Sequence, residues 1–149
     1  MNIRTANIND LRILREIETA SFNKFAYSTY ELKTMISQSD SLTLIYDDKI
    51  PLGYISFRRV DEKLWEIESI AIMPKAKRAG IGTALLKEYE RLAINKGAKR
   101  SILEVRVHNR KAIKFYEKHN YKIISTLPNF YSMSYHRSKD AYVMEKIFS

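Results

Sequence analysis

The feature that most constrains the fold is a pair of glycines, Gly80 and Gly82, between a strand-like and a helix-like apolar segment. The strand-like segment spans 64–73, and the helical spacing continues to about Gly97, which suits a C-cap. Glycine lets a ligand approach the backbone because no Cβ lies in the way. The first turn of a helix also leaves N–H groups unpaired and carries partial positive charge. The stretch 75–86 therefore predicts either a phosphate-binding turn or a purely structural one.

Two common nucleotide motifs are excluded at this turn. A Walker A motif carries Lys-Ser/Thr after its last glycine, whereas Gly82 is followed by Thr83. The dinucleotide fingerprint needs a third glycine, which the run G-I-G-T-A-L lacks. A phosphate bound here would therefore belong to another class of ligand.

The positive charge of the chain is concentrated in the segment that begins with this turn. The formal net charge is +9, and residues 75–118 hold 13 basic and 4 acidic side chains. The rest of the chain holds 13 of each, so the whole excess lies in that segment. A polyphosphate ligand, a nucleic acid and a solvated basic face would each account for it. A nucleic-acid-binding module is disfavoured because no recognised nucleic-acid motif accompanies the charge.

Length and composition limit the remaining classes. The 149 residues suit a single domain, spanning 1–149, with a genuine core. No run of about 18 apolar residues and no apolar N-terminal segment is present, so we expect no membrane partner and a cytoplasmic location. The absence of cysteine excludes disulfides, thiolate metal sites and a cysteine nucleophile. We expect no metal, because His108, His119 and His136 lack ligand spacing and suit surface or loop positions.

The apolar periodicities predict the order strand, two helices, three strands, helix, strand, helix and two strands. Asn7 with Asp10 and Ser28 with Glu31 are expected to cap the first two helices. The strands are expected at 1–6, 41–46, 52–59, 64–73, 101–107, 121–125 and 141–147, and the last helix at 109–119. This order predicts an α/β fold, a single mixed and mostly antiparallel sheet with helices on both faces.

Two motifs in this order resemble those of the GNAT (GCN5-related) N-acetyltransferases. The family's acetyl-coenzyme A turn reads Gln/Arg-x-x-Gly-x-Gly/Ala, and residues 77–82 read K-R-A-G-I-G. The spacing Asn109-x-x-Ala112-x-x-x-Tyr116 matches the second motif. Lys77 departs from the usual first residue but keeps the charge. The resemblance implies the acyl-CoA N-acyltransferase fold, with acetyl-CoA as the co-substrate.

Within that family the chain is most similar to the ribosomal-protein and N-terminal-amine acetyltransferases. Residues 25–28 read F-A-Y-S where the bacterial ribosomal-protein members carry F-P-W-S. Further matching segments are L-E-V-R at 103–106, N-F-Y at 129–131 and D-A-Y-V-M at 140–144. Asn120-Tyr121 replaces a Gly-Phe pair and Ser138-Lys139 replaces a glycine-containing turn, which weakens the match at the peptide site. The resemblance implies a protein N-terminus as the acceptor, such as that of a ribosomal protein; lysine, a polyamine or another small amine is the alternative.

The resemblance also assigns the residues that hold acetyl-CoA. Backbone groups at the end of the 64–73 strand would orient the thioester, and those of the glycine turn would bind the pyrophosphate. The residues assigned in this way are Ile70, Ala71, Ile72, Lys77, Arg78, Ala79, Gly80, Ile81, Gly82, Thr83, Asn109 and Tyr116.

Acetyl transfer needs a neutral amine and a proton for the departing thiolate. Without cysteine, direct attack in a ternary complex is the simplest route. Tyr116 is the candidate general acid, because a phenol of pKa about 10 can protonate a thiolate; a core tyrosine is the alternative. The candidate bases are Glu104, which matches the carboxylate of ribosomal-protein acetyltransferases, and Glu68 and Glu66, where other branches place theirs. Each glutamate could instead face solvent.

The chemistry of the acceptor favours an N-terminus. The pKa of an α-amino group is about 7.7–8.0, against about 10.4 for lysine, so far more of the former is neutral at pH 7. Modest carboxylate bases therefore suit α-amino groups better. The aromatic residues Phe25, Tyr27 and Tyr131 are candidates for the walls around a peptide N-terminus, with packing onto the sheet as the alternative.

Overall fold

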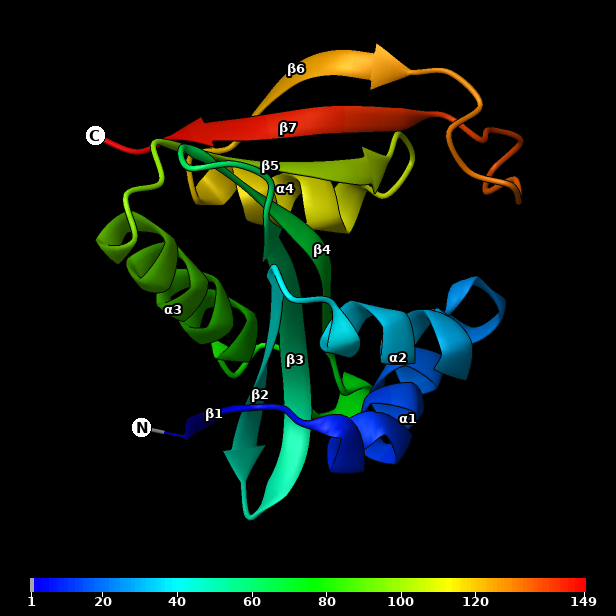
Figure 1. Ribbon diagram of the computed structural model, residues 1–149. Coiled ribbons are helices and arrows are strands. Elements are labelled where there is room, and N and C mark those ends of the chain that lie inside the picture. Colours follow the sequence, from blue (N-terminus) through cyan, green and yellow to red (C-terminus); the bar gives the residue numbers. More distant parts are fainter. Residues whose placement is uncertain (1) are drawn as a thin grey trace.

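The computed structural model describes residues 2–149, and its elements follow one another in the predicted order (Figure 1). The strands are β1 (Ile3–Thr5), β2 (Ser41–Asp48), β3 (Ile50–Arg59), β4 (Leu64–Ile72), β5 (Arg100–Arg106), β6 (Lys122–Leu127) and β7 (Ala141–Ile147). The α-helices are α1 (Leu11–Phe22), α2 (Thr29–Ser37), α3 (Ile81–Asn95) and α4 (Arg110–Lys118). Three short 3-10 turns are η1 (Ile8–Asp10), η2 (Asn23–Phe25) and η3 (Pro74–Ala76).

The cap predicted at Asn7 and the capping box predicted at Ser28 both form, and each is a capping box. The backbone N–H of Asn7 donates to the Asp10 carboxylate, while the Asn7 side chain accepts in return at the start of η1, which leads into α1. Ser28 and Glu31 exchange the equivalent pair of hydrogen bonds at the start of α2. Because these bonds involve only neighbours in sequence, the sequence alone places them. The prediction for β6 was less accurate, since the strand excludes the buried Tyr121 and runs to Leu127.

The seven strands form one sheet in the order β1-β2-β3-β4-β5-β7-β6. Every neighbouring pair is antiparallel except β4 and β5, which are parallel. The mixed, mostly antiparallel sheet of the prediction is therefore confirmed. The parallel pair is joined by the long α3 crossover, as parallel neighbours require.

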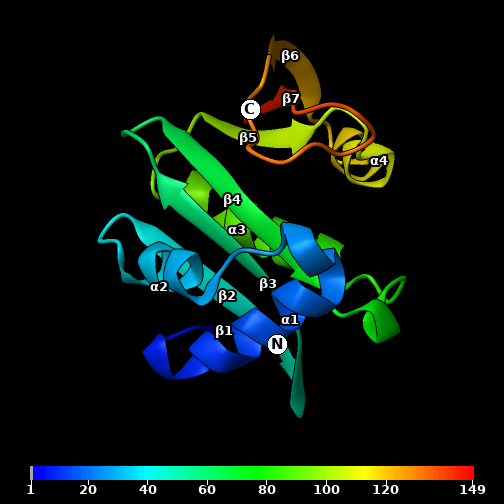
Figure 2. The same cartoon turned by 90° about the vertical axis from the view of Figure 1, so that its right-hand side faces the viewer.

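Helices cover both faces of the sheet, as predicted (Figure 2). The amphipathic helices α1 and α2 bury Leu14, Ile17, Leu32 and Met35 against one face, together with Tyr54 of β3. On the opposite face, α3 and α4 share a larger apolar cluster, which includes Leu85, Leu86, Tyr89, Phe57, Trp65 and Tyr116. Burial of these side chains is the main stabilising contribution to the fold. Among residues 2–149 no helix combines the length and the apolar character needed to cross a bilayer.

Candidate active site

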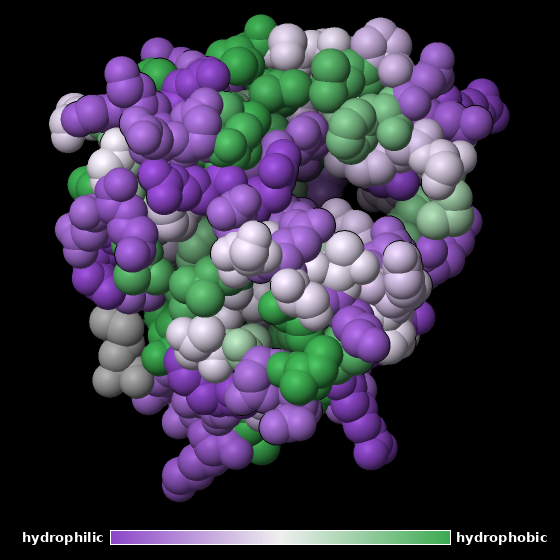
Figure 3. All heavy atoms as spheres, viewed as in Figure 1, coloured by the Kyte–Doolittle hydropathy of each residue, from purple (hydrophilic) through white to green (hydrophobic). Residues whose placement is uncertain are grey.

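A gap in the sheet opens between β4 and β5. Their pairing covers only Leu64–Glu66 opposite Arg100–Ile102, and beyond it the strands diverge (Figure 1). Figure 3 shows a hollow on this side of the molecule, between the elements at the top of the view and those at the lower right. The facing edges of the two strands therefore carry backbone N–H and C=O groups that no neighbouring strand pairs.

The free edge of β4 presents alternate residues to the gap. The N–H of Met73 donates to the Leu52 carbonyl at 2.8 Å, which makes this a hydrogen-bonded pair of the β3–β4 ladder. Because such pairs alternate along antiparallel strands, the backbone of Ala71 faces β3, while that of Ile70 and Ile72 faces the gap. The Ile72 carbonyl accepts a hydrogen bond from Ser21 at 3.0 Å. Of the three residues expected at the thioester, the backbone N–H of Ala71 is therefore directed away from it.

The glycine turn leaves backbone N–H groups free at the start of α3. Arg78 and Gly80 both take left-handed backbone conformations, with φ of 69° and 77°, and α3 starts immediately afterwards. None of the six N–H groups from Arg78 to Thr83 donates to an acceptor within residues 2–149. Successive N–H groups in such a turn point into one concavity, which binds anions. The side chains of Lys75, Lys77 and Arg78 are exposed around it.

Contacts between α3 and α4 place the second motif beside the glycine turn. Gly82 packs so close to the ring of Phe115 that a Cβ at this position would lie 3.4 Å from it. The hydroxyl of Thr83 lies 3.1 Å from Nε2 of His119, at the end of α4. His119 lies in the turn after α4, in line with the surface or loop position expected for it, but its ring is partly buried and this burial lowers its pKa. Asn109 caps α4 by accepting the N–H of Ala112 at 3.3 Å.

Two candidate bases, Glu104 and Glu66, come together from neighbouring strands. Burial and the nearby carboxylate of Glu66 raise the pKa of Glu104 to about 7. Glu66 itself is bound at 3.0 Å by the guanidinium of Arg58. Glu66 is therefore engaged in an ion pair, whereas Glu104 has a pKa suited to proton exchange at neutral pH.

The third candidate, Glu68, lies at a β-bulge. Ser56 faces Ser69 and Phe57 faces Ile67, so Glu68 is an extra residue without an opposite partner. A bulge turns its residues away from the regular alternation, and it commonly redirects a side chain beside an active site. The Glu68 carboxylate accepts a hydrogen bond from Ser41 at 3.2 Å, and burial raises its pKa. The shared face expected for Glu66 and Glu68 is consistent with burial of the intervening Ile67 on the other side.

Tyr116 approaches from the opposite face of the sheet. Its ring is buried in the cluster under α3 and α4, where it contacts the rings of Phe115 and Tyr121. Its hydroxyl forms no hydrogen bond with any residue between 2 and 149. Burial raises the pKa of Tyr116, and the hydroxyls of Tyr89, Tyr131 and Tyr27 add to this. The phenol therefore stays protonated at neutral pH.

The predicted aromatic walls are joined by a residue that the sequence did not single out. The guanidinium of Arg106, at the end of β5, lies 4.8 Å from the ring centre of Phe25 and 4.0 Å from that of Tyr131. It also donates to the Met133 carbonyl at 2.7 Å. Phe25 follows α1, whereas Tyr131 lies between β6 and β7, so Arg106 ties two distant segments together by cation–π contacts. Tyr27 lies beside them, with its hydroxyl 3.3 Å from the Glu68 carbonyl.

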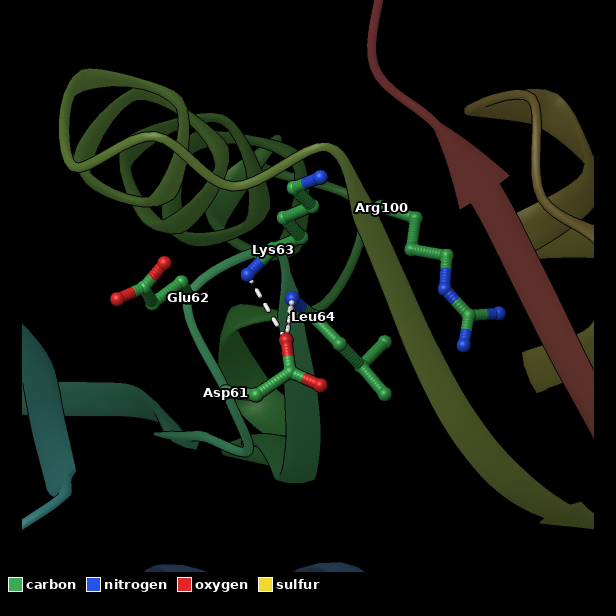
Figure 4. A pocket seen from close by; sticks show the side chains of 5 residues that line it. All are labelled: Asp61, Glu62, Lys63, Leu64 and Arg100. Atoms are coloured by element: carbon green, nitrogen blue, oxygen red, sulfur yellow. Dashed lines mark hydrogen bonds between the residues drawn. The ribbon is translucent and has the colours of Figure 1, made fainter.

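A second hollow lies elsewhere and lacks these features. It has a volume of about 400 Å³ and is lined by Asp61, Glu62, Lys63, Leu64 and Arg100 (Figure 4). It lies at the paired ends of β4 and β5, not at their divergent ends. The Asp61 carboxylate is already used there, because it accepts the N–H groups of Lys63 and Leu64 at 2.8 Å each.

The family is decided by comparison with known proteins. A family profile described as "Acetyltransferase (GNAT) family" matches residues 11–121, which is most of the chain. The chain belongs to the GNAT family. The profile spans α1, the gap between β4 and β5, the glycine turn and α4, so it covers both motifs of the candidate site.

Relatives of this GNAT protein carry acetyltransferase names. It is 33% identical over 133 residues to an uncharacterized N-acetyltransferase of Methanocaldococcus jannaschii, covering 88% of this chain and 84% of the relative. It is 28% identical over 145 residues to N-alpha-acetyltransferase 50 of Danio rerio, covering 94% and 82% respectively. A shorter match, to an uncharacterized N-acetyltransferase of Bacillus subtilis, covers 64% of each protein. The chain is accordingly an N-acetyltransferase.

The GNAT fold is also that of solved structures. The crystal structure of the ribosomal-protein-S18-alanine N-acetyltransferase from Escherichia coli superposes with a TM-score of 0.88. The match covers 99% of this chain and 93% of that one at 23% identity. At this identity the likeness concerns the fold, and it confirms the predicted acyl-CoA N-acyltransferase architecture.

Proposed function

We propose that this GNAT protein transfers the acetyl group of acetyl-CoA to the α-amino group of a protein N-terminus, by direct attack in a ternary complex. The observation that carries the proposal is the arrangement around the gap between β4 and β5. A carboxyl group with a pKa of about 7, Glu104, lies on one side, and a protonated phenol, Tyr116, comes from the other. An acceptor amine and a thioester meeting in this gap would find a base and an acid together.

The residues present fit acetyl-CoA. The unpaired N–H groups from Arg78 to Thr83 suit a pyrophosphate, because they add hydrogen bonds to the positive end of the α3 dipole. The N–H groups of Ile70 and Ile72 suit the extended acyl-bearing arm, which would run along the free edge of β4. Among residues 2–149 no cluster of three metal-binding side chains exists, and the reaction proposed here uses none.

The proposed reaction balances without a further reactant. The neutral amine nitrogen attacks the thioester carbonyl carbon, and a C–N bond forms as the C–S bond breaks. The carboxylate of Glu104, directly or through a water, takes the proton that the nitrogen loses. The hydroxyl of Tyr116 gives its proton to the departing thiolate sulfur. Glu104 and Tyr116 then exchange the proton through solvent to restore the resting state.

An α-amino acceptor is supported by its acidity and by the relatives. At pH 7 roughly a tenth of an α-amino group is neutral, against well below 0.1% of a lysine side chain. A base with a pKa of about 7 can take the proton that an α-ammonium group loses when it becomes a neutral amine. One relative is an N-alpha-acetyltransferase, and the fold is shared with an enzyme that modifies a ribosomal protein. A ribosomal protein is thus the first target to test.

The acceptor is tested directly with a peptide array. Purified protein and acetyl-CoA are offered peptides with free N-termini, the same peptides with blocked N-termini and an internal lysine, and spermidine. We expect acetylation of free N-termini only. Spermidine is included because a polycationic amine could also bind among the carboxylates of Glu66, Glu68 and Glu104. If spermidine is acetylated and no peptide is, the N-terminal proposal is wrong.

A matched pair of glycine variants tests the pyrophosphate site. Gly80 and Gly97 lie at the two ends of α3 with φ of 77° and 95°, and neither has an atom within 4 Å of an added Cβ. Gly80→Ala and Gly97→Ala should therefore lose similar stability, on the order of 1 kcal/mol each. Only Gly80→Ala should weaken acetyl-CoA binding, by about tenfold, because it displaces the unpaired N–H groups. Titration calorimetry and thermal melts measure both; equal acetyl-CoA affinity in the two variants would contradict the assignment.

A further inference from the structure

Glu18 is a buried carboxylate for which the proposed reaction has no use. It lies in α1 and is 1% exposed, whereas the candidate bases lie on β4 and β5. Its Oε1 accepts the backbone N–H of Tyr27 at 3.0 Å, and its Oε2 accepts the hydroxyl of Tyr54 at 2.5 Å. Removing a carboxylate from water is costly, so its partners must recover that cost. An apolar residue in place of Glu18 would fill the same space without this desolvation cost. The presence of Glu18 therefore raises the question of which residue it positions.

Both backbone polar groups of Tyr27 are held by α1. While Glu18 accepts its N–H, the guanidinium of Arg15 donates to its carbonyl at 2.7 Å. Arg15 and Glu18 are three residues apart on a helix and therefore lie on the same side of it. A loop residue fixed at both its donor and its acceptor by charged side chains cannot rotate about its backbone without breaking charge-assisted hydrogen bonds.

The hydrogen bonds from Arg15 and Glu18 to the backbone of Tyr27 are called the clamp below. The start of α2 does not need this clamp. Ser28 and Glu31 already satisfy each other's backbone donors there. The hydrogen bonds of Arg15 and Glu18 fall on the residue before this capping box. Their effect is therefore on the orientation of Tyr27, not on the formation of the helix.

The side chain of Tyr27 connects the clamp to the bulge of β4. Its side chain is largely buried and its hydroxyl donates to the Glu68 carbonyl at 3.3 Å. A second connection runs from Glu18 through the Tyr54 hydroxyl, which lies 3.0 Å from Oγ of Ser69. Both connections start at Glu18 and end on neighbouring residues of the bulge, next to the gap.

We propose that Glu18, together with Arg15, is a positioning residue of the acceptor site, acting by holding Tyr27 against the bulge at Glu68. This deepens the proposed function and depends on the gap being the place where the acceptor binds. Tyr27 so held forms a fixed wall for the incoming amine. Loss of the clamp weakens acceptor binding and leaves the acetyl-CoA site, on α3 and the edge of β4, unchanged.

The test compares Glu18→Ala and Glu18→Gln with Glu16→Ala. Glu16 is an exposed residue of the same helix, pairs with Arg12 at 3.5 Å, and serves as the matched control. Glu18→Ala should raise the acceptor KM about tenfold, through two lost charge-assisted hydrogen bonds, with acetyl-CoA affinity within about twofold of wild type. Glu18→Gln should recover most of this, because its amide accepts from Tyr27 and donates to Tyr54. Glu16→Ala should match wild type.

Hydrogen exchange tests the same clamp without any acceptor. The segment 23–31 should exchange at least about tenfold faster in Glu18→Ala, while the α3 turn is unaffected. If Glu18→Ala does not fold, Tyr54→Phe removes one of the two bonds and keeps the ring, and it should give a smaller change of the same kind. In a Tyr27→Ala background, Glu18→Ala should add little further rise in KM, since Glu18 is proposed to act by holding Tyr27.

The outcomes separate this proposal from the proposed function. If only spermidine is acetylated, the KM for spermidine is measured in place of the KM for the peptide. If no acceptor is found, the hydrogen-exchange data alone test the clamp. Unchanged exchange at 23–31 in the variants that fold would overturn the proposal. A parallel fall in acetyl-CoA affinity in every Glu18 variant would do the same, because that pattern indicates a general structural role.

Discussion

Tyr116→Phe is expected to lower kcat by about 10²–10³-fold while acetyl-CoA affinity stays within about twofold of wild type. The phenol is the only acid that we place beside the departing thiolate, and its raised pKa keeps it protonated throughout the neutral range. Phenylalanine preserves the ring and its contacts with Phe115 and Tyr121. The variant therefore removes one proton and very little packing. Steady-state kinetics and calorimetry with acetyl-CoA measure the two effects.

A second buried tyrosine of the same cluster provides the control. The hydroxyl of Tyr121 lies 3.1 Å from Glu90 and 3.0 Å from Ser101, whereas that of Tyr116 forms no hydrogen bond with a residue in the range 2–149. Tyr121→Phe should therefore lower the melting temperature and leave kcat nearly unchanged. Tyr116→Phe should instead lower kcat and leave the melting temperature nearly unchanged. Near-normal turnover in Tyr116→Phe would assign that residue to the core alone.

The parts of the fold that depend on neighbours in sequence could be predicted. The caps at Asn7 and Ser28 need only a few adjacent residues, and the structure contains both. The bulge at Glu68 depends instead on how β4 is registered against β3. Nothing within 64–73 marks the extra residue, because a strand with or without a bulge has the same composition.

The same distinction applies to the site. The glycine turn is one contiguous stretch, so its glycines and basic residues mark it directly as a candidate phosphate site. Arg106 and His119 were missed because their partners lie far along the chain: Arg106 contacts Phe25 and Tyr131, and His119 contacts a residue 36 positions away. A basic residue at the end of a strand has no local sign of an aromatic partner. The orientation of Ala71 could have been anticipated from strand alternation, since it lies between Ile70 and Ile72.

Glu104→Gln is expected to lower kcat/KM by about 10²–10³-fold at pH 8 and to change the shape of the pH profile. Glu104 acts as a base only when ionised, and its pKa of about 7 means that wild-type activity should rise with pH through that value. In Glu104→Gln this rise should disappear, and only the ionisation of the acceptor amine should remain. The neighbouring carboxylate offers an independent check. Glu66→Gln removes a negative charge that raises the pKa of Glu104, so the rise should move to lower pH.

Ionisation of Glu104 should lower the stability of the fold while it raises activity. A folded-state pKa above the ordinary value means that the fold disfavours the ionised form, so Glu104 costs stability as the pH rises above about 4.5 and fully above about 7. Glutamine carries no charge, so Glu104→Gln should melt at the same or a higher temperature at pH 8 and show no gain at pH 4. A variant that is inactive yet at least as stable identifies a group kept for chemistry. A loss of stability at pH 8, or a pH profile that keeps its rise near pH 7, would instead remove Glu104 as the base and leave Glu68 as the next carboxylate to replace.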